Sequence, residues 1–139
     1  MLSSRQRELV QATWLQVLPV QEAAAALFYD KLFKLDPTLR PLFPPDLREQ
    51  RKKLMQALQF TVATLDSPER LIPTLEDLGR MHRRYGVRDE DFDTVGEALL
   101  WALKQGLGTA FTPEVREAWA TAYAVVSDVM RDALADAIA

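Results

Sequence analysis

The stretch LIPTLEDLGRMHRRYGV, residues 71–87, contains the only histidine of the chain. Its apolar residues and this histidine recur at intervals of three and four, which places them on one face of an α-helix. The members of this face are Leu71, Leu75, Leu78, His82 and Tyr85. Gly86 predicts a left-handed helix end, after which Val87 can pack back against the helix. The stretch therefore predicts a helix that carries one imidazole on its apolar side.

A single histidine on an apolar helix face has two interpretations. Most such histidines are core residues whose ring nitrogens are hydrogen-bonded. The alternative is a metal ligand, because neutral imidazole is a common ligand of transition metals. The rest of the sequence must decide between them.

The composition is typical of a globular protein with no membrane or nucleic-acid partner. The chain has 139 residues, 48% of them hydrophobic and 27% charged, and a formal net charge of −3 at pH 7. This length predicts a single domain, residues 1–139, with room for a cofactor. The lack of a basic excess disfavours binding to nucleic-acid phosphates. No signal-peptide core or run of about 20 apolar residues is present, so we expect a cytoplasmic location.

Cysteine is absent from the sequence. This excludes disulfides, thiolate metal sites, cysteine nucleophiles, iron–sulfur clusters and thioether attachment of haem. Any haem would therefore be held non-covalently.

Helical periodicity extends over almost the whole chain, and no segment has the pattern of a strand. We expect an all-α fold of about seven helices that cross at steep angles, with proline and glycine between them. Four helices are expected in the first half of the chain. The first is capped by Ser3 or Ser4 and ends at about Leu18, and the second runs from about Val20 to Leu35. The third is short, is capped by Asp36 and ends at about Leu42, and the fourth runs from about Leu47 to Leu65 with Asp46 as the cap. Further starts are expected at Ser67–Pro68, Asp89–Asp91 and Thr112–Pro113, and Pro73 is expected to break or restart a helix.

Two details of helix packing follow from the same pattern. The first helix can bury either Leu9, Ala12 and Leu15 or the neighbouring set Val10, Trp14 and Val17. Gly79 and Gly96 predict close helix crossings, as does the alanine run 23–26.

Gln50 and His82 each place a polar side chain on an otherwise apolar helix face. A haem needs such an arrangement: an imidazole on one side of the iron, hydrocarbon against the porphyrin and a hydrogen-bond donor opposite. Tyr29 can supply a phenolic donor and Gln50 an amide, while Leu54, one turn later, would wall the pocket. From helix geometry, we expect the second ring nitrogen of His82 to donate to the carbonyl of Leu78.

At these residues the sequence resembles the globin family. Tyr29, Phe43 at the end of RPLF, Gln50 in QRKKLM and His82 in LGRMHRRYGV follow the order and spacing of globins. The resemblance covers essentially the whole chain, and it is to single-domain bacterial haemoglobins, to neuroglobin and to the haem domain of flavohaemoglobins. It implies a globin fold around haem b, without a D helix after Phe43.

The resemblance also implies a role for each matching residue. His82 would be the proximal iron ligand and Gln50 the distal residue, with Tyr29 and Leu54 completing the distal pocket and Phe43 wedging the porphyrin. Further cofactor contacts are expected from Lys53, Tyr85, Val87, Phe92 and Val95. For Lys53, which could meet a haem propionate, a solvated lysine is an equally good interpretation.

Some positions depart from the related families. With no second histidine, the bis-histidine coordination of neuroglobin is impossible. Pairing of Tyr29 with Gln50 instead resembles flavohaemoglobins, which oxidise nitric oxide with bound oxygen. The proximal tyrosine and glutamate of those proteins are matched by Phe92 and Leu134, which cannot hydrogen-bond to a histidine. We also expect no reductase domain.

These features predict reversible binding of oxygen, and also of carbon monoxide and nitric oxide, for oxygen transport or storage. Two functional alternatives stay open: nitric oxide dioxygenation with an external reductase, and gas or redox sensing through a partner. A cofactor-free helical bundle is the remaining alternative. We expect a monomer or a weak homo-oligomer.

Overall fold

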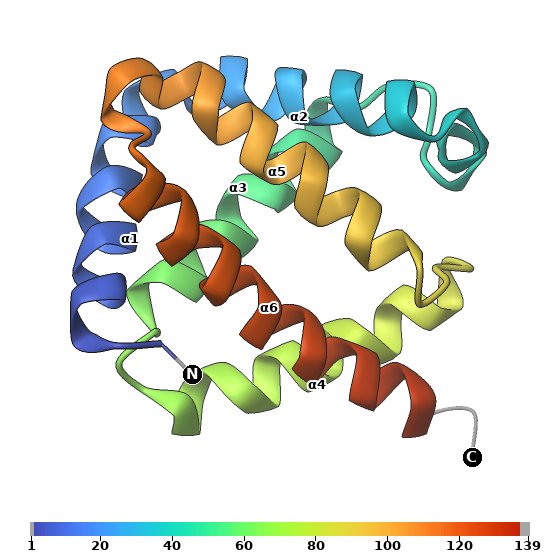
Figure 1. Ribbon diagram of the computed structural model, residues 1–139. Coiled ribbons are helices and arrows are strands. Elements are labelled where there is room, and N and C mark those ends of the chain that lie inside the picture. Colours follow the sequence, from blue (N-terminus) through green and yellow to red (C-terminus); the bar gives the residue numbers. More distant parts are fainter. Residues whose placement is uncertain (1, 137–139) are drawn as a thin grey trace.

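The computed structural model describes residues 2–136, and within that range all regular structure is helical (Figure 1). The α-helices are α1 Ser4–Val17, α2 Gln21–Leu35, α3 Arg48–Ala63, α4 Pro68–Arg84, α5 Asp91–Leu107 and α6 Pro113–Asp136. Short 3₁₀ segments are η1 Leu18–Val20, η2 Pro37–Leu42 and η3 Gly108–Ala110. The predicted all-α fold is confirmed, and residues 43–47, where a D helix would lie, are not helical.

Side-chain caps begin several helices where the sequence predicts them. The Ser3 hydroxyl accepts from the Gln6 N–H at 3.0 Å, and the Gln6 side chain accepts from the Ser3 N–H at 2.9 Å. Before α6, the Thr112 hydroxyl accepts from the Val115 N–H at 3.2 Å. Each bond satisfies an N–H group that has no partner inside the helix.

The start of α3 differs slightly from the prediction. Leu47 occupies the N-cap position and makes no side-chain cap. Asp46, one residue earlier, still accepts from the Arg48 N–H at 3.0 Å and pairs with the Arg48 guanidinium at 2.7 Å. The predicted carboxylate therefore stabilises the start of α3, although it lies one position before the observed N-cap.

Pro73 neither breaks nor restarts a helix, so this prediction is wrong. Helix α4 is continuous from Pro68 to Arg84 with Pro73 inside it. Leu71 and Leu75, 5% and 1% exposed, anchor the helix in the core on both sides of the proline. Their burial offsets the hydrogen bond that proline cannot donate.

Close approaches between helices occur where the sequence has its small residues. Helix α6 packs against α4 and α1, and α2 packs against α5 (Figure 1). A Cβ at Gly79 would lie 2.6 Å from the Met130 carbonyl oxygen, and one at Gly96 would lie 2.7 Å from the Tyr123 ring. The predicted crossings at both glycines are therefore confirmed. The alanine run contributes Ala25, which is completely buried.

The buried face of α1 is the second of the two sets that the periodicity allows. Val10, Trp14 and Val17 are 1–2% exposed, whereas Leu15 is 67% exposed. The Trp14 ring lies 6.3 Å from that of Trp119 on α6, between ring centroids. This aromatic contact places α1 against α6. Among the described helices, none is long and apolar enough to cross a membrane.

Candidate functional site

His82 lies in the last turn of α4 and is partly buried. Its Nδ1 is hydrogen-bonded to the carbonyl of Leu78, which confirms the contact predicted from helix geometry. Because a carbonyl oxygen can only accept, Nδ1 carries a proton, and in the neutral ring the lone pair then lies on Nε2. Within residues 2–136, no protein group is hydrogen-bonded to Nε2. In its neutral form the imidazole can therefore bind a metal through Nε2.

The chain turns sharply just after His82. Gly86 has a φ of 81°, and the Val87 N–H donates to the His82 carbonyl at 3.2 Å. This is the left-handed helix end predicted from the sequence. Val87 is half-buried and packs against the core, whereas Tyr85 is 57% exposed at the protein surface. The turn fixes the backbone on which the imidazole is mounted.

Phe92, at the start of α5, lies next to the imidazole. The ring centroids of Phe92 and His82 are 6.2 Å apart, and Phe92 is 4% exposed. The guanidinium carbon of Arg131 lies 5.4 Å from the Phe92 ring centroid, and the Tyr123 hydroxyl donates to the Phe92 carbonyl at 2.5 Å. Burial raises the pKa of Tyr123, so this phenol stays a donor at neutral pH. Phe92 is therefore held in place by Arg131 at its side chain and by Tyr123 at its backbone carbonyl.

Two other predicted residues of the same side lie in the core. Leu134 is 6% exposed on α6, and Val95, one turn after Phe92, is partly buried. Leu134, Val95 and Phe92 all lack a polar side-chain atom. Phe92 therefore offers the imidazole an apolar contact, and none of these three side chains can hydrogen-bond to it.

Tyr29 on α2 and Gln50 in the first turn of α3, the two predicted distal residues, are hydrogen-bonded to each other. The Gln50 amide donates to the Tyr29 oxygen at 3.2 Å, and the Tyr29 hydroxyl donates to the Gln50 backbone carbonyl at 3.4 Å. Burial raises the pKa of Tyr29, while the Gln50 hydrogen bond and the charge of Arg51 act in the opposite direction. The phenol is therefore neutral at physiological pH and able to donate.

Phe43 completes an aromatic cluster with Tyr29. Its ring centroid lies 5.6 Å from that of Tyr29 and 5.4 Å from that of Phe33, with both pairs edge-on. Phe33 was not predicted as a site residue, although its i, i+4 spacing from Tyr29 on α2 could have indicated it. Leu54, one turn after Gln50, is partly buried and packs against the core. Lys53 beside it is exposed.

These residues have the chemistry that a haem requires. A single imidazole fills one coordination position, so an iron on His82 would need its remaining ligands from a group such as a porphyrin. The helices that carry His82 and Gln50, α4 and α3, are not packed extensively on each other and are held instead by α6 and α2. The described side chains thus offer a nitrogen ligand, aromatic and aliphatic walls, and two hydrogen-bond donors on separate helices.

Comparison with known proteins identifies the family. A globin family model matches residues 26–130. Neuroglobin of Tetraodon nigroviridis is 33% identical over 139 aligned residues, which cover 90% of this chain and 87% of that protein. A flavohemoprotein of Rhizobium meliloti (strain 1021) is 33% identical over 133 aligned residues. That alignment covers 94% of this chain and 33% of the flavohemoprotein, so the chain spans about a third of that relative.

Solved structures give the same result. An engineered carbene transferase of Rhodothermus marinus, itself a proposed nitric oxide dioxygenase, superposes with a TM-score of 0.90 at 28% identity. The superposition covers 99% of this chain and 96% of that one. A hexacoordinated haem protein from an anhydrobiotic tardigrade shares the fold, with a TM-score of 0.87 at 19% identity and 96% coverage of both chains. By its family match and by its relatives, the chain belongs to the globin family.

Proposed function

We propose that this globin holds haem b non-covalently through Nε2 of His82 and binds oxygen reversibly, for transport or storage. Globins bind haem and, through it, diatomic gases, and carbon monoxide and nitric oxide would compete for the same position. The sequence has no cysteine for covalent attachment of the haem vinyl groups. A bound haem would supply an iron centre for the gas, and the protein would supply the His82 ligand and the surrounding side chains.

The contact between Tyr29 and Gln50 is the observation that carries this proposal. Both side chains hold a donor in a largely apolar region, where an unpaired polar group costs about 1–3 kcal/mol. Bonded to each other, they avoid that cost, and a polarised gas ligand offers both donors a new acceptor. Phe43 and Leu54 would line the haem on the side where the gas binds. The side of His82 would be lined by Val87, Phe92 and Val95. We further propose that Lys53 and Tyr85 contact the haem edge.

The rate of oxygen release tests the role of the donor pair. Each hydrogen bond to a polarised ligand contributes about 1.5–3 kcal/mol, which corresponds to about a ten- to hundredfold change in rate. The double variant Tyr29→Phe/Gln50→Leu should therefore release oxygen at least about tenfold faster in stopped-flow replacement by carbon monoxide. Gln56→Leu, an exposed change on the same helix, is the matched control. An unchanged release rate in the double variant would refute the role.

Nitric oxide dioxygenation with an external reductase is the second candidate. The flavohemoprotein and Rhodothermus marinus relatives favour it, as does the distal Tyr29–Gln50 pair. Phe92 and Leu134 offer no hydrogen bond to the imidazole, which favours reversible binding instead. Sustained consumption of nitric oxide with a reductase present would support the enzyme. A single turnover would not, because oxygenated globins commonly react once. A cytoplasmic location and a monomeric or weakly associated state stay predictions.

A further inference from the structure

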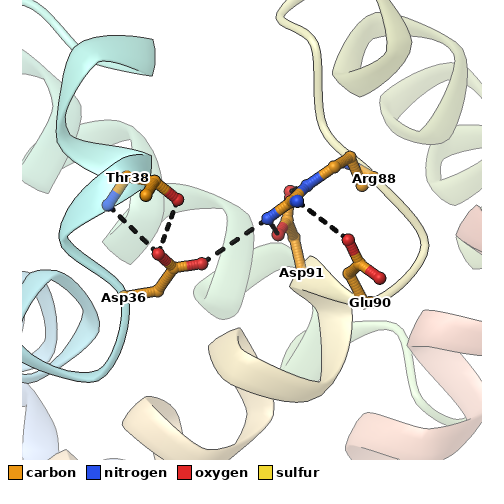
Figure 2. A network of polar contacts seen from close by, with 5 residues as sticks. All are labelled: Asp36, Thr38, Arg88, Glu90 and Asp91. Atoms are coloured by element: carbon orange, nitrogen blue, oxygen red, sulfur yellow. Dashed lines mark hydrogen bonds and ion pairs between the residues drawn. The ribbon is translucent and has the colours of Figure 1, made fainter.

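Arg88, in the loop between α4 and α5, is the centre of a charged network (Figure 2). Its guanidinium lies 2.9 Å from a Glu90 oxygen, 3.0 Å from an Asp91 oxygen and 3.5 Å from an Asp36 oxygen. Glu90 and Asp91 belong to the same loop and the start of α5, whereas Asp36 lies between α2 and η2. The Arg88–Asp36 pair therefore joins two segments that are far apart in the sequence, and we refer to it as the clasp.

Each of the two residues of the clasp is also held by other partners. The Asp91 side chain is 4% exposed, and its carboxylate accepts from the Arg88 backbone N–H at 2.9 Å as well as from the guanidinium. A buried carboxylate is stable only with such partners, so Asp91 anchors Arg88. On the other side, the Thr38 N–H and hydroxyl donate to one oxygen of Asp36, at 3.0 and 2.5 Å. The second oxygen of Asp36 faces Arg88 (Figure 2).

This fixation distinguishes the clasp from an ordinary surface ion pair. Such pairs contribute little, partly because two long side chains must be immobilised to form them. Hydrogen bonding by Thr38, and also the charge of Arg88, lower the pKa of Asp36, so the carboxylate is ionised at neutral pH. The Asp36–Arg88 pair is therefore pre-oriented and charged.

The segments that the clasp joins carry residues of the proposed haem site. On one side, Arg88 directly follows Val87 and lies one turn before Phe92, which contacts the imidazole. On the other side, Asp36 caps η2, the segment that leads to Phe43. Separation of the loop after His82 from the segment that leads to Phe43 would require the clasp to break.

We propose that the clasp slows the loss of haem by holding the loop after His82 against the segment that leads to Phe43. Arg88 and Asp36 act as positioning residues through the backbone segments that they join. This inference rests on the proposed function, because it assumes a haem on His82. It goes beyond that function because it assigns cofactor retention to residues outside the proposed haem contacts.

The decisive variant is Asp36→Asn. Asparagine keeps the oxygen that accepts from Thr38, but it replaces the charged oxygen that faces Arg88 with an amide. Haem transfer from the ferric protein to an excess of a haem-free acceptor globin should become about two- to fivefold faster at low ionic strength. About 1 M salt should reduce the difference, because salt screens exposed charges. Glu114→Gln, which removes the exposed 3.0 Å pair between Arg5 and Glu114, is the matched control and should leave the rate unchanged.

Arg88→Gln gives a second test. It should accelerate haem transfer more than Asp36→Asn, because it also removes a partner of the buried Asp91 carboxylate. The double variant should be no faster than Arg88→Gln alone, since the clasp is already lost. Wild-type haem transfer rates in Asp36→Asn, or additive effects in the double variant, would overturn the proposal.

A readout without haem separates the clasp from the proposed function. In the apoprotein, Asp36→Asn should increase amide hydrogen exchange in both joined segments, residues 36–43 and 87–92. Increased exchange in both segments supports the joining role of the clasp without any haem. If the protein then proved not to bind haem, the proposed function and the haem-retention role would fail, but the joining role would stand. Increased exchange on one side only, or on neither, would overturn the clasp.

Discussion

Gly79→Ala should destabilise the protein, although alanine is the better helix former. Gly79 lies one turn before His82, where α4 crosses α6. A Cβ there would lie 2.6 Å from the Met130 carbonyl oxygen, 3.0 Å from the Met130 Cα and 3.1 Å from the Ala133 Cβ. Two of these three atoms belong to the backbone and cannot move by a rotamer change. Helices α4 and α6 must therefore separate for the methyl group to fit.

The magnitude follows from two opposing effects. Overpacking of a core costs about 1–3 kcal/mol, and contact with backbone places Gly79→Ala near the upper end of this range. Replacing glycine by alanine inside a helix stabilises the helix by about 1 kcal/mol. We therefore expect a net loss of about 2 kcal/mol in the free energy of unfolding.

Denaturant unfolding of the apoprotein, followed by circular dichroism, measures this difference. Gly106→Ala is the matched control, because its nearest neighbour would be a Val20 methyl group at 3.9 Å and its φ is not positive. This variant should gain about 0.5–1 kcal/mol from helix propensity alone. If Gly79→Ala is as stable as wild type, or gains as much as Gly106→Ala, the close crossing at α4 is refuted. Displacement of α4 should also alter the ferrous haem spectrum.

Three further predictions concern titration and buried hydrogen bonds. The hydrogen bond with Arg48 lowers the pKa of Asp46 to about 2, against about 3.9 in the unfolded chain. The ionised carboxylate therefore stabilises the protein above a pH of about 3.9, and this stabilisation is lost as the pH falls toward 2. Asp46→Asn should flatten the acid unfolding curve, followed by circular dichroism, in that pH window. Burial raises the pKa of Tyr29, so the phenol ionises more readily in the unfolded chain, and the stability of the fold should decrease as the pH rises above about 10. In an ultraviolet titration, Tyr29→Phe should remove one phenol that ionises late. Thr13→Val removes the hydroxyl that accepts from Trp119 Nε1 at 2.9 Å and should cost about 1–3 kcal/mol in denaturant unfolding; wild-type stability would contradict the assigned bond.

Local features of the site could be predicted because they depend on residues within one turn. The contact of His82 with Leu78 follows from helix geometry, and the helix end at Gly86 follows from the freedom of glycine to adopt positive φ. Pro73 shows the limit of such rules. Proline disfavours a continuous helix, but the burial of Leu71 and Leu75 overrides this preference, and that burial depends on the packing of α4 within the whole fold.

Features that join distant segments could not be derived from local pattern. Helical periodicity left two candidate faces for α1, and only the contact of Trp14 with α6 distinguishes them. The meeting of Tyr29 with Gln50 was expected from the globin resemblance, not from spacing. Asp36 was correctly predicted as a helix cap, but its pairing with Arg88 depends on the tertiary fold.

The central claim is that Nε2 of His82 holds the haem iron. The most direct test is the absorption spectrum of the ferrous, gas-free protein after reconstitution with haem, compared between wild type and His82→Gly. We expect a five-coordinate histidine-ligated spectrum in wild type, its loss in His82→Gly, and its recovery when free imidazole is added. Haem bound with an unchanged spectrum in His82→Gly would contradict the assignment of His82 as the ligand.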